Sequence, residues 1–402
     1  MGCGLVPEIK VDAVVNLAGT GKPNFPVSPT HSGGSALSTL NTHSYTSSGT
    51  EPSSPKNGAI WWDSANSKVM VYINGEFKEI TLNTAYPTSG ATSQGDRGFV
   101  AAGLGYNGSS YDEKMNRIQY WDITTVANAA DFGDLATGSE ESGGTCSGTR
   151  AVVKHGQTGS GFPAGYSTQI DYFATATTGN ASDFGDSTMD ANRICGLSDG
   201  TKGVFAGGAG DVSGGSSYQN LNVIDYITIA STGNATDFGD LLSANSGCVS
   251  TNDNTRGIFI GGYDGSNILN TLQYITIATP GNAIDFGDDL TTSFKSSRGV
   301  MADGTYGVWQ NGYTGSAYKS NVIAYLTVQS LGNATDFGDI SEARKEAQST
   351  SNATKGHING GSGASLSNSI EQITIATPGN SSDFADLDIA TITAAGLSGA
   401  AS

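Results

Sequence analysis

Cysteine, proline and basic residues are all scarce in this chain of 402 residues. It contains 4 Cys and 10 Pro, and its 19 Lys and Arg stand against 37 Asp and Glu, which gives a net charge of −18. So few cysteines exclude a disulfide scaffold and favour assembly in a reducing cytoplasm. Because duplex binding relies on Lys and Arg to displace counterions from phosphates, we expect no nucleic-acid partner.

Long apolar runs and targeting signals are also missing. No run approaches the ~18 apolar residues that a membrane helix needs, so we expect no membrane insertion. The first residues, MGCGLVPEIKVDAV, have no basic segment followed by an apolar one, which predicts no secretory signal. The 4 His residues are scattered without ligand spacing, so we expect no metal and no cofactor, and leave only calcium at loop 263–267 open.

Glycine and an internal repeat are what the sequence has in abundance. Gly occupies 57 positions, about twice the usual share, which indicates many tight turns. Asp-Phe-Gly-Asp, once as Asp-Phe-Ala-Asp, recurs about every 50 residues. Its copies begin at Asp131, Asp183, Asp237, Asp285, Asp336 and Asp383. A period of this length predicts an array of similar supersecondary units.

Each repeat contains four short stretches with strand character. A small-residue segment such as 246–251 comes first, and a strand that ends in Gly, such as 256–262, follows. The third stretch, such as 223–230, alternates side chains between two faces and is rich in β-branched and aromatic residues. After a Gly-Asn turn the fourth leads into Asp-Phe-Gly-Asp. Since no segment has helical period over 10–12 residues, the chain is predicted to be all-β.

Residues 88–402 resemble kelch repeats, which share this period and the double Gly after the second strand. The Trp that usually follows in kelch repeats is missing here. The resemblance implies a six-bladed kelch-like β-propeller over residues 87–402, with an open solenoid as the alternative. The C-terminal segment LDIATITAAGLSGAAS looks like a first strand without a second. It could therefore complete the first blade and close the ring, although residues 88–95 fit the same place.

Residues 1–86 lack the repeat and divide in two. Residues 1–50 are rich in Ser, Thr and Gly, so we expect an extended attachment segment held by neighbouring chains. Residues 51–86 predict a small β-meander with strands 59–62, 68–73 and 76–82, since Asn-Gly at 74–75 is a strong hairpin signal. Such a small sheet needs a partner surface. We therefore expect an oligomerising module, in a homotrimer, that buries Trp61 or Trp62 against another chain.

Two stretches resemble bacteriophage proteins. PSSPKNGAIWWDS, followed by KVMVYINGEF, is similar to a module common in tail fibres and other virion appendages. Repeats such as YITIATPGNAIDFGD resemble those in structural proteins of marine and cyanobacterial tailed phages. The resemblance implies a virion protein, assembled in the host cytoplasm, whose N-terminal segment binds other virion proteins and whose propeller binds a host-surface glycan or protein. The alternative is a capsid-decoration or tail component whose propeller contacts only virion proteins.

Motifs that could carry chemistry obey the repeat instead. Asp-Phe-Gly also occurs in kinases, but six copies without a phosphate loop predict a structural role, with Phe packed between repeats and Asp accepting turn N–H groups. One repeat position, just before the second strand, holds Arg97, Arg150 and Arg256. Buried small residues are expected at Cys146, Cys195 and Cys248. We expect no enzyme activity, and a carbohydrate-active propeller enzyme is the least favoured alternative.

Tyrosines gather in the variable loops between second and third strands. In a propeller these loops and those between fourth and first strands share one end of the blades, while the other end carries uniform Gly-Asn turns. Variable, Tyr-rich loops are typical of binding surfaces, and we expect this end to point away from the particle. The candidate receptor-binding residues are Tyr106, Tyr166, Tyr263 and Tyr313. The alternative is that these rings only pack against their own loops.

Overall fold

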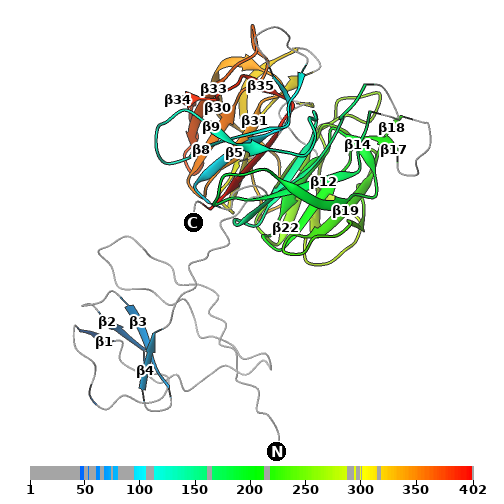
Figure 1. The fold of residues 1–402 in the computed structure, drawn as a ribbon. Helices are drawn as coiled ribbons and strands as arrows, with labels where there is room; N and C mark the ends of the chain where they lie inside the picture. The colour runs from blue at the N-terminus through cyan, green and yellow to red at the C-terminus, as the bar shows by residue number, and fades with distance from the viewer. Residues whose placement is uncertain are drawn as a thin grey trace, which may run out of the picture. The chain divides into compact units, whose positions relative to one another are not determined.

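The computed structural model divides the chain into two compact units, residues 1–84 and 85–402. In the first unit it describes residues 46–48, 53, 60–63, 68–73 and 76–79. In the second it describes residues 95–105, 113–160, 165–211, 218–287, 294–295, 299, 301–314 and 318–400 (Figure 1). All regular elements in these ranges are β-strands. No helix long and apolar enough to span a bilayer occurs among them.

The first unit contains one four-stranded sheet with the order β1-β2-β3-β4. Its strands are β1 (Thr46–Ser48), β2 (Ile60–Asp63), β3 (Lys68–Ile73) and β4 (Glu76–Glu79). The last three form the predicted antiparallel meander. Strand β1 adds a parallel partner to β2 that the Ser/Thr-rich sequence did not predict, because a three-residue polar strand has no apolar period. The predicted burial of Trp61 or Trp62 lies outside the side chains that the structure describes.

The described part of residues 95–400 contains six four-stranded antiparallel sheets, which we number by repeat. Sheet 1 is β36 (Ala395–Gly399), β5 (Arg97–Ala101), β8 (Arg117–Asp122) and β9 (Ala130–Asp134). Sheet 2 is β10 (Gly143–Cys146), β11 (Arg150–Lys154), β12 (Gln169–Ala174) and β13 (Ser182–Asp186). Sheet 3 is β15 (Cys195–Ser198), β16 (Lys202–Ala206), β19 (Val223–Thr228) and β20 (Thr236–Asp240).

The remaining three sheets have the same order of first, second, third and fourth strand. Sheet 4 is β21 (Val249–Asn252), β22 (Arg256–Ile260), β23 (Leu272–Thr276) and β24 (Ile284–Gly287). Sheet 5 is β26 (Met301–Ala302), β27 (Tyr306–Gln310), β29 (Ser320–Thr327) and β30 (Thr335–Arg344). Sheet 6 is β31 (Gln348–Ser351), β32 (Lys355–Asn359), β33 (Ser369–Thr374) and β34 (Ser382–Asp386).

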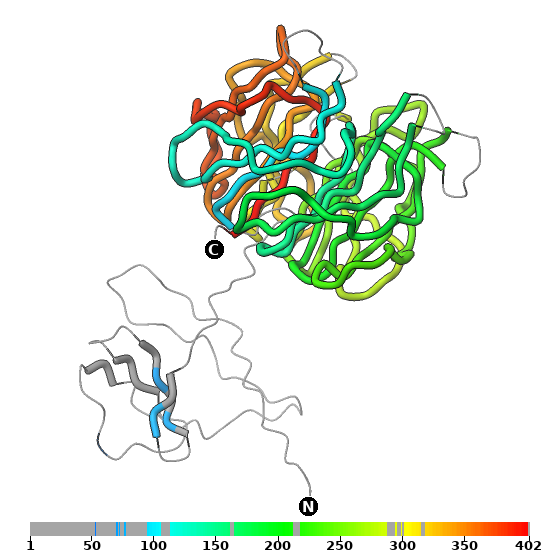
Figure 2. The backbone as a smooth tube through the Cα atoms, in the orientation of Figure 1, coloured from blue at the N-terminus to red at the C-terminus, as the bar shows by residue number. Residues whose placement is uncertain are grey.

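The first strands of the sheets contact one another in sequence. Strand β10 contacts β15, β15 contacts β21, β21 contacts β26, and β26 contacts β31. Strand β36 contacts both β31 and β10, so the series returns to its start. The C-terminal strand β36 pairs with β5, with Ala395 opposite Ala101, and the two lie side by side in Figures 1 and 2. It is therefore the C-terminal segment that completes sheet 1.

Among the described residues, the backbone of the Asp-Phe-Gly-Asp motif, or of its Asp-Phe-Ala-Asp variant, joins five of the sheets to the next. The N–H of its second Asp donates to the Asn side chain of the following Gly-Asn turn, as Asp186 does to Asn234 Oδ1 at 3.1 Å. Equivalent bonds are Asp134–Asn180, Asp240–Asn282, Asp339–Asn380 and Asp386–Asn128. The last of these links sheet 6 to sheet 1. The motif Gly has positive φ, +147° at Gly239, where an added Cβ would lie 2.6 Å from the Gly281 backbone.

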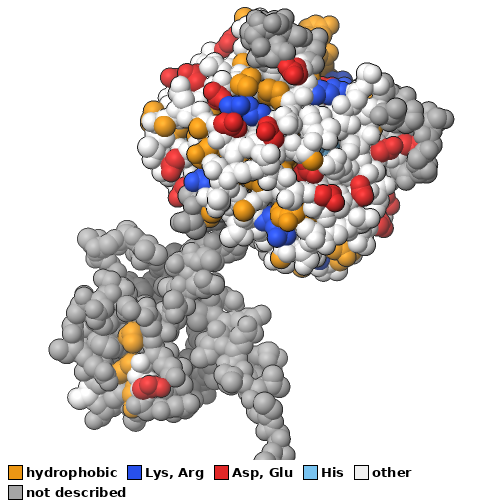
Figure 3. Space-filling view, in the orientation of Figure 1, with side chains coloured by type: hydrophobic (Ala, Val, Ile, Leu, Met, Phe, Trp, Pro, Cys, Tyr) orange, Lys and Arg blue, Asp and Glu red, His pale blue; other side chains and the backbone are white. Residues whose placement is uncertain are grey.

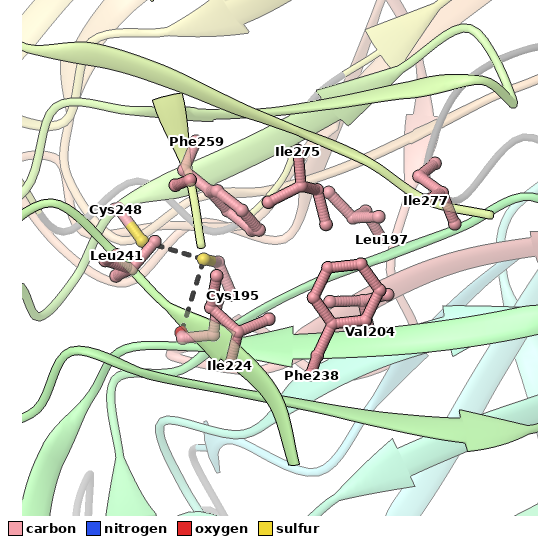
Figure 4. Close-up of a cluster of buried hydrophobic side chains, with 12 residues drawn as sticks. Cys195, Leu197, Val204, Ile224, Phe238, Leu241, Cys248, Phe259, Ile275 and Ile277 are labelled. Atoms are coloured by element: carbon pink, nitrogen blue, oxygen red, sulfur yellow. Dashed lines mark hydrogen bonds between the residues drawn. The ribbon is translucent and has the colours of Figure 1, made fainter. Parts of the chain in front are cut away.

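Hydrophobic side chains fill the space between neighbouring sheets. Figure 4 shows one cluster, in which Phe238 of the sheet 3 motif packs with Phe259 and Ile275 of sheet 4. Cys195 and Cys248 lie in the same cluster as free thiols with their sulfur atoms 2.7 Å apart. The six motif Phe rings are all buried, which confirms their predicted place in the core. Burial of such a side chain contributes about 1.5–3 kcal/mol.

A second tier of pairing lies beyond one end of the six sheets. There the loop after each second strand pairs with the segment that leads into the first strand. The tier contains β35 (Thr391–Ile392), β6 (Leu104–Gly105) and β7 (Glu113–Lys114); β14 (Asp190–Asn192), β17 (Ala209–Asp211) and β18 (Gln219–Asn220); and β25 (Phe294–Lys295) with β28 (Tyr313–Thr314). In the other sheets isolated β-bridges replace these strands; in sheet 4, for example, Tyr263 pairs with both Ser246 and Ile268. The two loop types therefore share one end, as the alternation of strands predicts.

Candidate functional site

Three of the four predicted tyrosines lie in this second tier. Tyr166 and Tyr263 form bridges with the loop strands around them, and Tyr313 lies in β28. Each is half-buried, so part of each ring faces solvent. Tyr106 falls outside the described residues. The three rings come from sheets 2, 4 and 5, so the tier is what brings them to one end of the molecule.

Lys295 lies between two of these tyrosines. Its Nζ is 3.7 Å from the ring centroid of Tyr263 and 5.2 Å from that of Tyr313. Strand β25 holds it there, because Lys295 pairs with Tyr313 across the second tier. Burial, and secondarily the positive charge of Arg193, lower the pKa of Lys295. The ammonium therefore joins sheet 4 to sheet 5 through two cation–π contacts.

Arg193 adds a second cation and a second pair of tyrosines. Its Nε donates to Glu141 Oε1 at 3.0 Å. Tyr166 and Tyr218 lie close enough to Arg193 to affect its pKa, which the Glu141 carboxylate helps to raise. The rings of Tyr166 and Tyr218 come from adjacent sheets, and their centroids are 5.7 Å apart. Partial burial and the neighbouring Tyr218 hydroxyl raise the pKa of Tyr166 to about 12, so its phenol stays neutral.

These residues form one group, which we call the aromatic–basic patch. Its members are Tyr166, Arg193, Tyr218, Tyr263, Lys295 and Tyr313. Tyr218 is 47% exposed, and Tyr318, whose ring packs edge-on against Tyr313 at 5.5 Å, is 77% exposed. On the face shown in Figure 3, backbone and side chains that are neither hydrophobic nor charged cover most of the described surface, and Lys and Arg lie in small separate groups. The patch therefore combines ring faces with cations in a strongly acidic chain.

The backbone under the patch adopts an unusual conformation. Glu141 and Arg193 have φ of 56° and 57°, a left-handed conformation that non-glycine residues rarely adopt. Both occupy the repeat position two residues before the first strand, and Gly247, Glu346 and Thr393 have the same left-handed conformation there, with φ of 66°, 58° and 57°. The N–H of Arg193 donates to Glu141 O at 3.0 Å, and that of Gly247 donates to Arg193 O at 2.9 Å. A chain of backbone hydrogen bonds thus holds Glu141 and Arg193 in place.

Most other basic side chains have a structural role that the repeat explains. Arg97, Arg150, Lys202 and Arg256 begin the second strands, and each lies over the Tyr of its own third strand. Each also donates to a carbonyl of the following sheet, as Arg150 Nη1 does to Ile229 O at 2.9 Å. The same links are Arg97 to Thr175, Lys202 to Ala278, and Arg256 to Val328. These cations hold neighbouring sheets together, and their recurrence in four sheets indicates a structural role.

Buried polar side chains fix the loops that carry the patch. At one position of the third strand, a carboxylate or amide accepts the N–H of the loop toward the next first strand. Asp171 accepts the N–H of Ala136, Asp225 that of Thr188, Gln273 that of Leu242, Glu371 that of Ser341, and Gln119 that of Ile389. Lys154 Nζ donates to three carbonyls within 2.9 Å, those of His155, Ser167 and Ala191. In sheet 5, Gln310 Nε2 takes the corresponding place and lies within hydrogen-bond distance of three carbonyl oxygens, two of which its N–H groups can serve.

One buried cluster has the residue types of a hydrolase triad. His155 Nδ1 is 2.9 Å from Ser139 Oγ, and His155 Nε2 is 2.9 Å from Asp171 Oδ2. All three side chains have 0% exposure, so no substrate can reach the hydroxyl. Asp171 also has the loop-fixing role that carboxylates and amides have in other sheets. We therefore interpret the cluster as a structural hydrogen-bond network.

Comparison with known proteins adds no identity: no family model and no curated protein matches this chain. The site must be judged on its own geometry. Sequence reasoning named the tyrosines and missed Arg193 and Lys295. No clear break in the repeat marks Lys295, since Lys345 stands at the corresponding place in sheet 6 and Ser246 in sheet 4. The sequence could not show which tyrosine each cation would meet, because that depends on the register of the second tier.

Proposed function

We propose that residues 87–402 form a six-bladed, kelch-like β-propeller rather than an open solenoid. The cyclic contacts of the first strands support this, as does the pairing of β36 with β5. The bond from Asp386 to Asn128 repeats at the seam the link that joins the other sheets. A solenoid would leave the edges at its two ends unpaired, whereas radial closure protects them.

We further propose that the chain is a bacteriophage virion structural protein, a tail fibre or appendage, whose propeller binds the host cell surface through the aromatic–basic patch. The patch is the observation that carries the binding role. Tyr263 and Tyr313 occupy equivalent positions in sheets 4 and 5, but sheets 2 and 6 have Gln157 and Ser362 there, so the patch varies among the sheets more than the residues with structural roles do. Tyr and Arg are enriched among residues that dominate binding energy, and tyrosine rings offer stacking surfaces for sugars. The phage assignment depends on the resemblance of residues 51–402 to virion proteins.

The direction of the chain supports recognition at the patch end. Strand β5 starts at Arg97, and Arg97 pairs with Asp122 at the end of the third strand, β8. The turn toward the fourth strand begins there. The chain therefore enters sheet 1 at the end that carries the Gly-Asn turns, opposite the patch. In this proposal residues 1–50 attach to other virion proteins, residues 51–86 form a homotrimer, and the patch is left free for the host.

The test is adsorption of particles that carry Tyr106, Tyr166, Tyr263 and Tyr313 changed to Ala. We expect normal assembly and adsorption to host cells reduced about 10-fold or more, since each hot-spot residue contributes at least about 2 kcal/mol. The matched control replaces Val126 and Leu331 by Ser. These side chains are 73% and 61% exposed and belong to the Gly-Asn end. Unchanged adsorption of the tyrosine variant would refute receptor binding.

A purely structural virion component, in the capsid or the tail, is the other candidate. It predicts that the patch is buried against another virion protein. A map of the assembled particle with this chain placed in it distinguishes the two, because the receptor-binding proposal requires the patch to face outward. The same map counts the copies of the chain and tests the homotrimer.

A further inference from the structure

The ammonium of Lys295 has hydrogen-bonding capacity that the protein does not use. Among the described residues it has no hydrogen-bond acceptor and no carboxylate partner; its contacts are the rings of Tyr263 and Tyr313. An ammonium carries three N–H donors. Withdrawing it partly from water without an acceptor is unfavourable, and nearby Arg193 makes the surroundings more positive. An anionic group bound at this point would remove both penalties.

Other lysines at the same end are satisfied within the protein. Lys345 occupies the corresponding register in sheet 6, and its Nζ lies 3.5 Å from Glu346. Lys114 lies 3.3 Å from Glu140, and Lys319 donates to the Gly363 carbonyl. In the part of the chain that the structure describes, Lys295 is thus the lysine of the second tier that is left for a ligand. Lys345 provides a matched control.

We propose that Lys295 binds the carboxylate or phosphate of an anionic saccharide, whose sugar rings stack on the tyrosines of the aromatic–basic patch. This inference depends on the proposed host-surface function and names the chemistry of the ligand. Charge-assisted hydrogen bonds to an ammonium are shorter and about twice as strong as neutral ones. The flanking rings of Tyr263 and Tyr313 hold Nζ in place, so little side-chain freedom is lost on binding.

The experiment titrates the full chain with tetragalacturonate, with its neutral methyl ester, and with a phosphorylated mannose oligosaccharide, by calorimetry. The two anionic probes distinguish a carboxylate ligand from a phosphate ligand. We expect one of them to bind, the methyl ester not to bind, and the affinity to fall between about 20 mM and about 200 mM salt because screening weakens exposed ion pairs. Binding of the ester as tight as that of the acid would overturn the proposal without any variant.

Variants then locate the site. Lys295→Met keeps the aliphatic stem and should weaken binding by about 10- to 100-fold, the range for a hydrogen bond to a charged group. Lys295→Arg should retain most of the affinity, and Lys345→Met should bind as the wild type does. Equal binding by Lys295→Met and wild type, or no binding of either anionic probe, would refute the inference.

Cell binding separates this inference from the function on which it depends. If the chain binds host cells and protease treatment of the cells, but not periodate, abolishes binding, the partner is a protein. The saccharide inference then fails while receptor binding holds. If the chain binds no host cells and particles with Lys295→Met adsorb normally, both fail.

Discussion

Protonation of His357 is expected to weaken the contact between sheet 6 and sheet 1. His357 lies in β32 with 0% exposure, and Trp121 of β8 donates its Nε1–H to His357 Nδ1 at 2.8 Å. The ring also packs against Phe384, with centroids 4.3 Å apart. A protonated imidazole has no acceptor nitrogen, so the Trp121 N–H would face another N–H. Burial, and secondarily the charge of Lys355, lower the pKa of His357 to about 3.

The size of the effect follows from this pKa. In the unfolded chain the pKa of His357 is near 6.5. Between about pH 6.5 and pH 3 this imidazole is therefore protonated in the unfolded state and neutral in the folded state. Stability from this site is complete above that window and falls as the pH decreases through it, by about 1.4 kcal/mol per pH unit. Between about pH 7 and pH 5 the free energy of unfolding should therefore drop by about 2 kcal/mol.

Urea unfolding followed by tryptophan fluorescence measures this loss. His357→Gln is the comparison, because its amide oxygen can still accept from Trp121 and it does not titrate. We expect the wild type to lose about 2 kcal/mol more than the variant between about pH 7 and pH 5. Equal losses in the two proteins, or a measured pKa of His357 near 6.5, would show that the argument from burial is wrong.

Three further predictions concern residues with structural roles. Gly239→Ala should destabilise the chain by about 2–4 kcal/mol in urea, since φ is +147° and the new Cβ would lie 2.6 Å from backbone. Lys154→Gln should fold with near-native stability because an amide fills this place in sheet 5, whereas Lys154→Met should lower the unfolding free energy by about 2–4 kcal/mol; equal loss in both would contradict this. Burial raises the pKa of Cys146 to about 12, so a disulfide reagent at about pH 8 should modify it only after denaturation, as mass spectrometry can check.

The local sequence pattern was enough to predict the strands of the six four-stranded sheets. The alternation in residues 223–230 predicted β19. The C-terminal segment was one of two candidates to pair with the second strand of the first repeat, and the structure shows that it does so as β36. Such features depend on side-chain period and on the count of strands per repeat, both visible in the chain. The Asp-Phe-Gly-Asp prediction was correct for Phe. For Asp, the structure shows the backbone N–H donating to an Asn of the next repeat instead of the expected carboxylate acceptor.

The second tier could not be predicted, because its pairs join loops without period or turn signature. Lys295 meets Tyr313 through a two-residue pairing, and it meets Tyr263 across a sheet boundary. Neither contact leaves a trace in local sequence, since polar loop residues satisfy no packing rule of their own. The contact between the buried side chains of Ser139 and His155 could not be predicted for the same reason. Long-range register, rather than propensity, is the information that the structure adds.

Residues with a structural role in this chain make contacts that recur in several sheets, so a contact that does not recur is a better candidate for a binding role. Arg150 and Asp171 have chemically suggestive side chains, yet equivalents in other sheets make the same bonds, so packing accounts for them. The left-handed backbone two residues before the first strand also follows the repeat, since Glu141, Arg193, Glu346 and Thr393 share it and sheet 4 has Gly247 there. Lys295 does depart from the repeat in its contacts: it meets the rings of Tyr263 and Tyr313, whereas Lys345 at the corresponding register in sheet 6 lies beside Glu346.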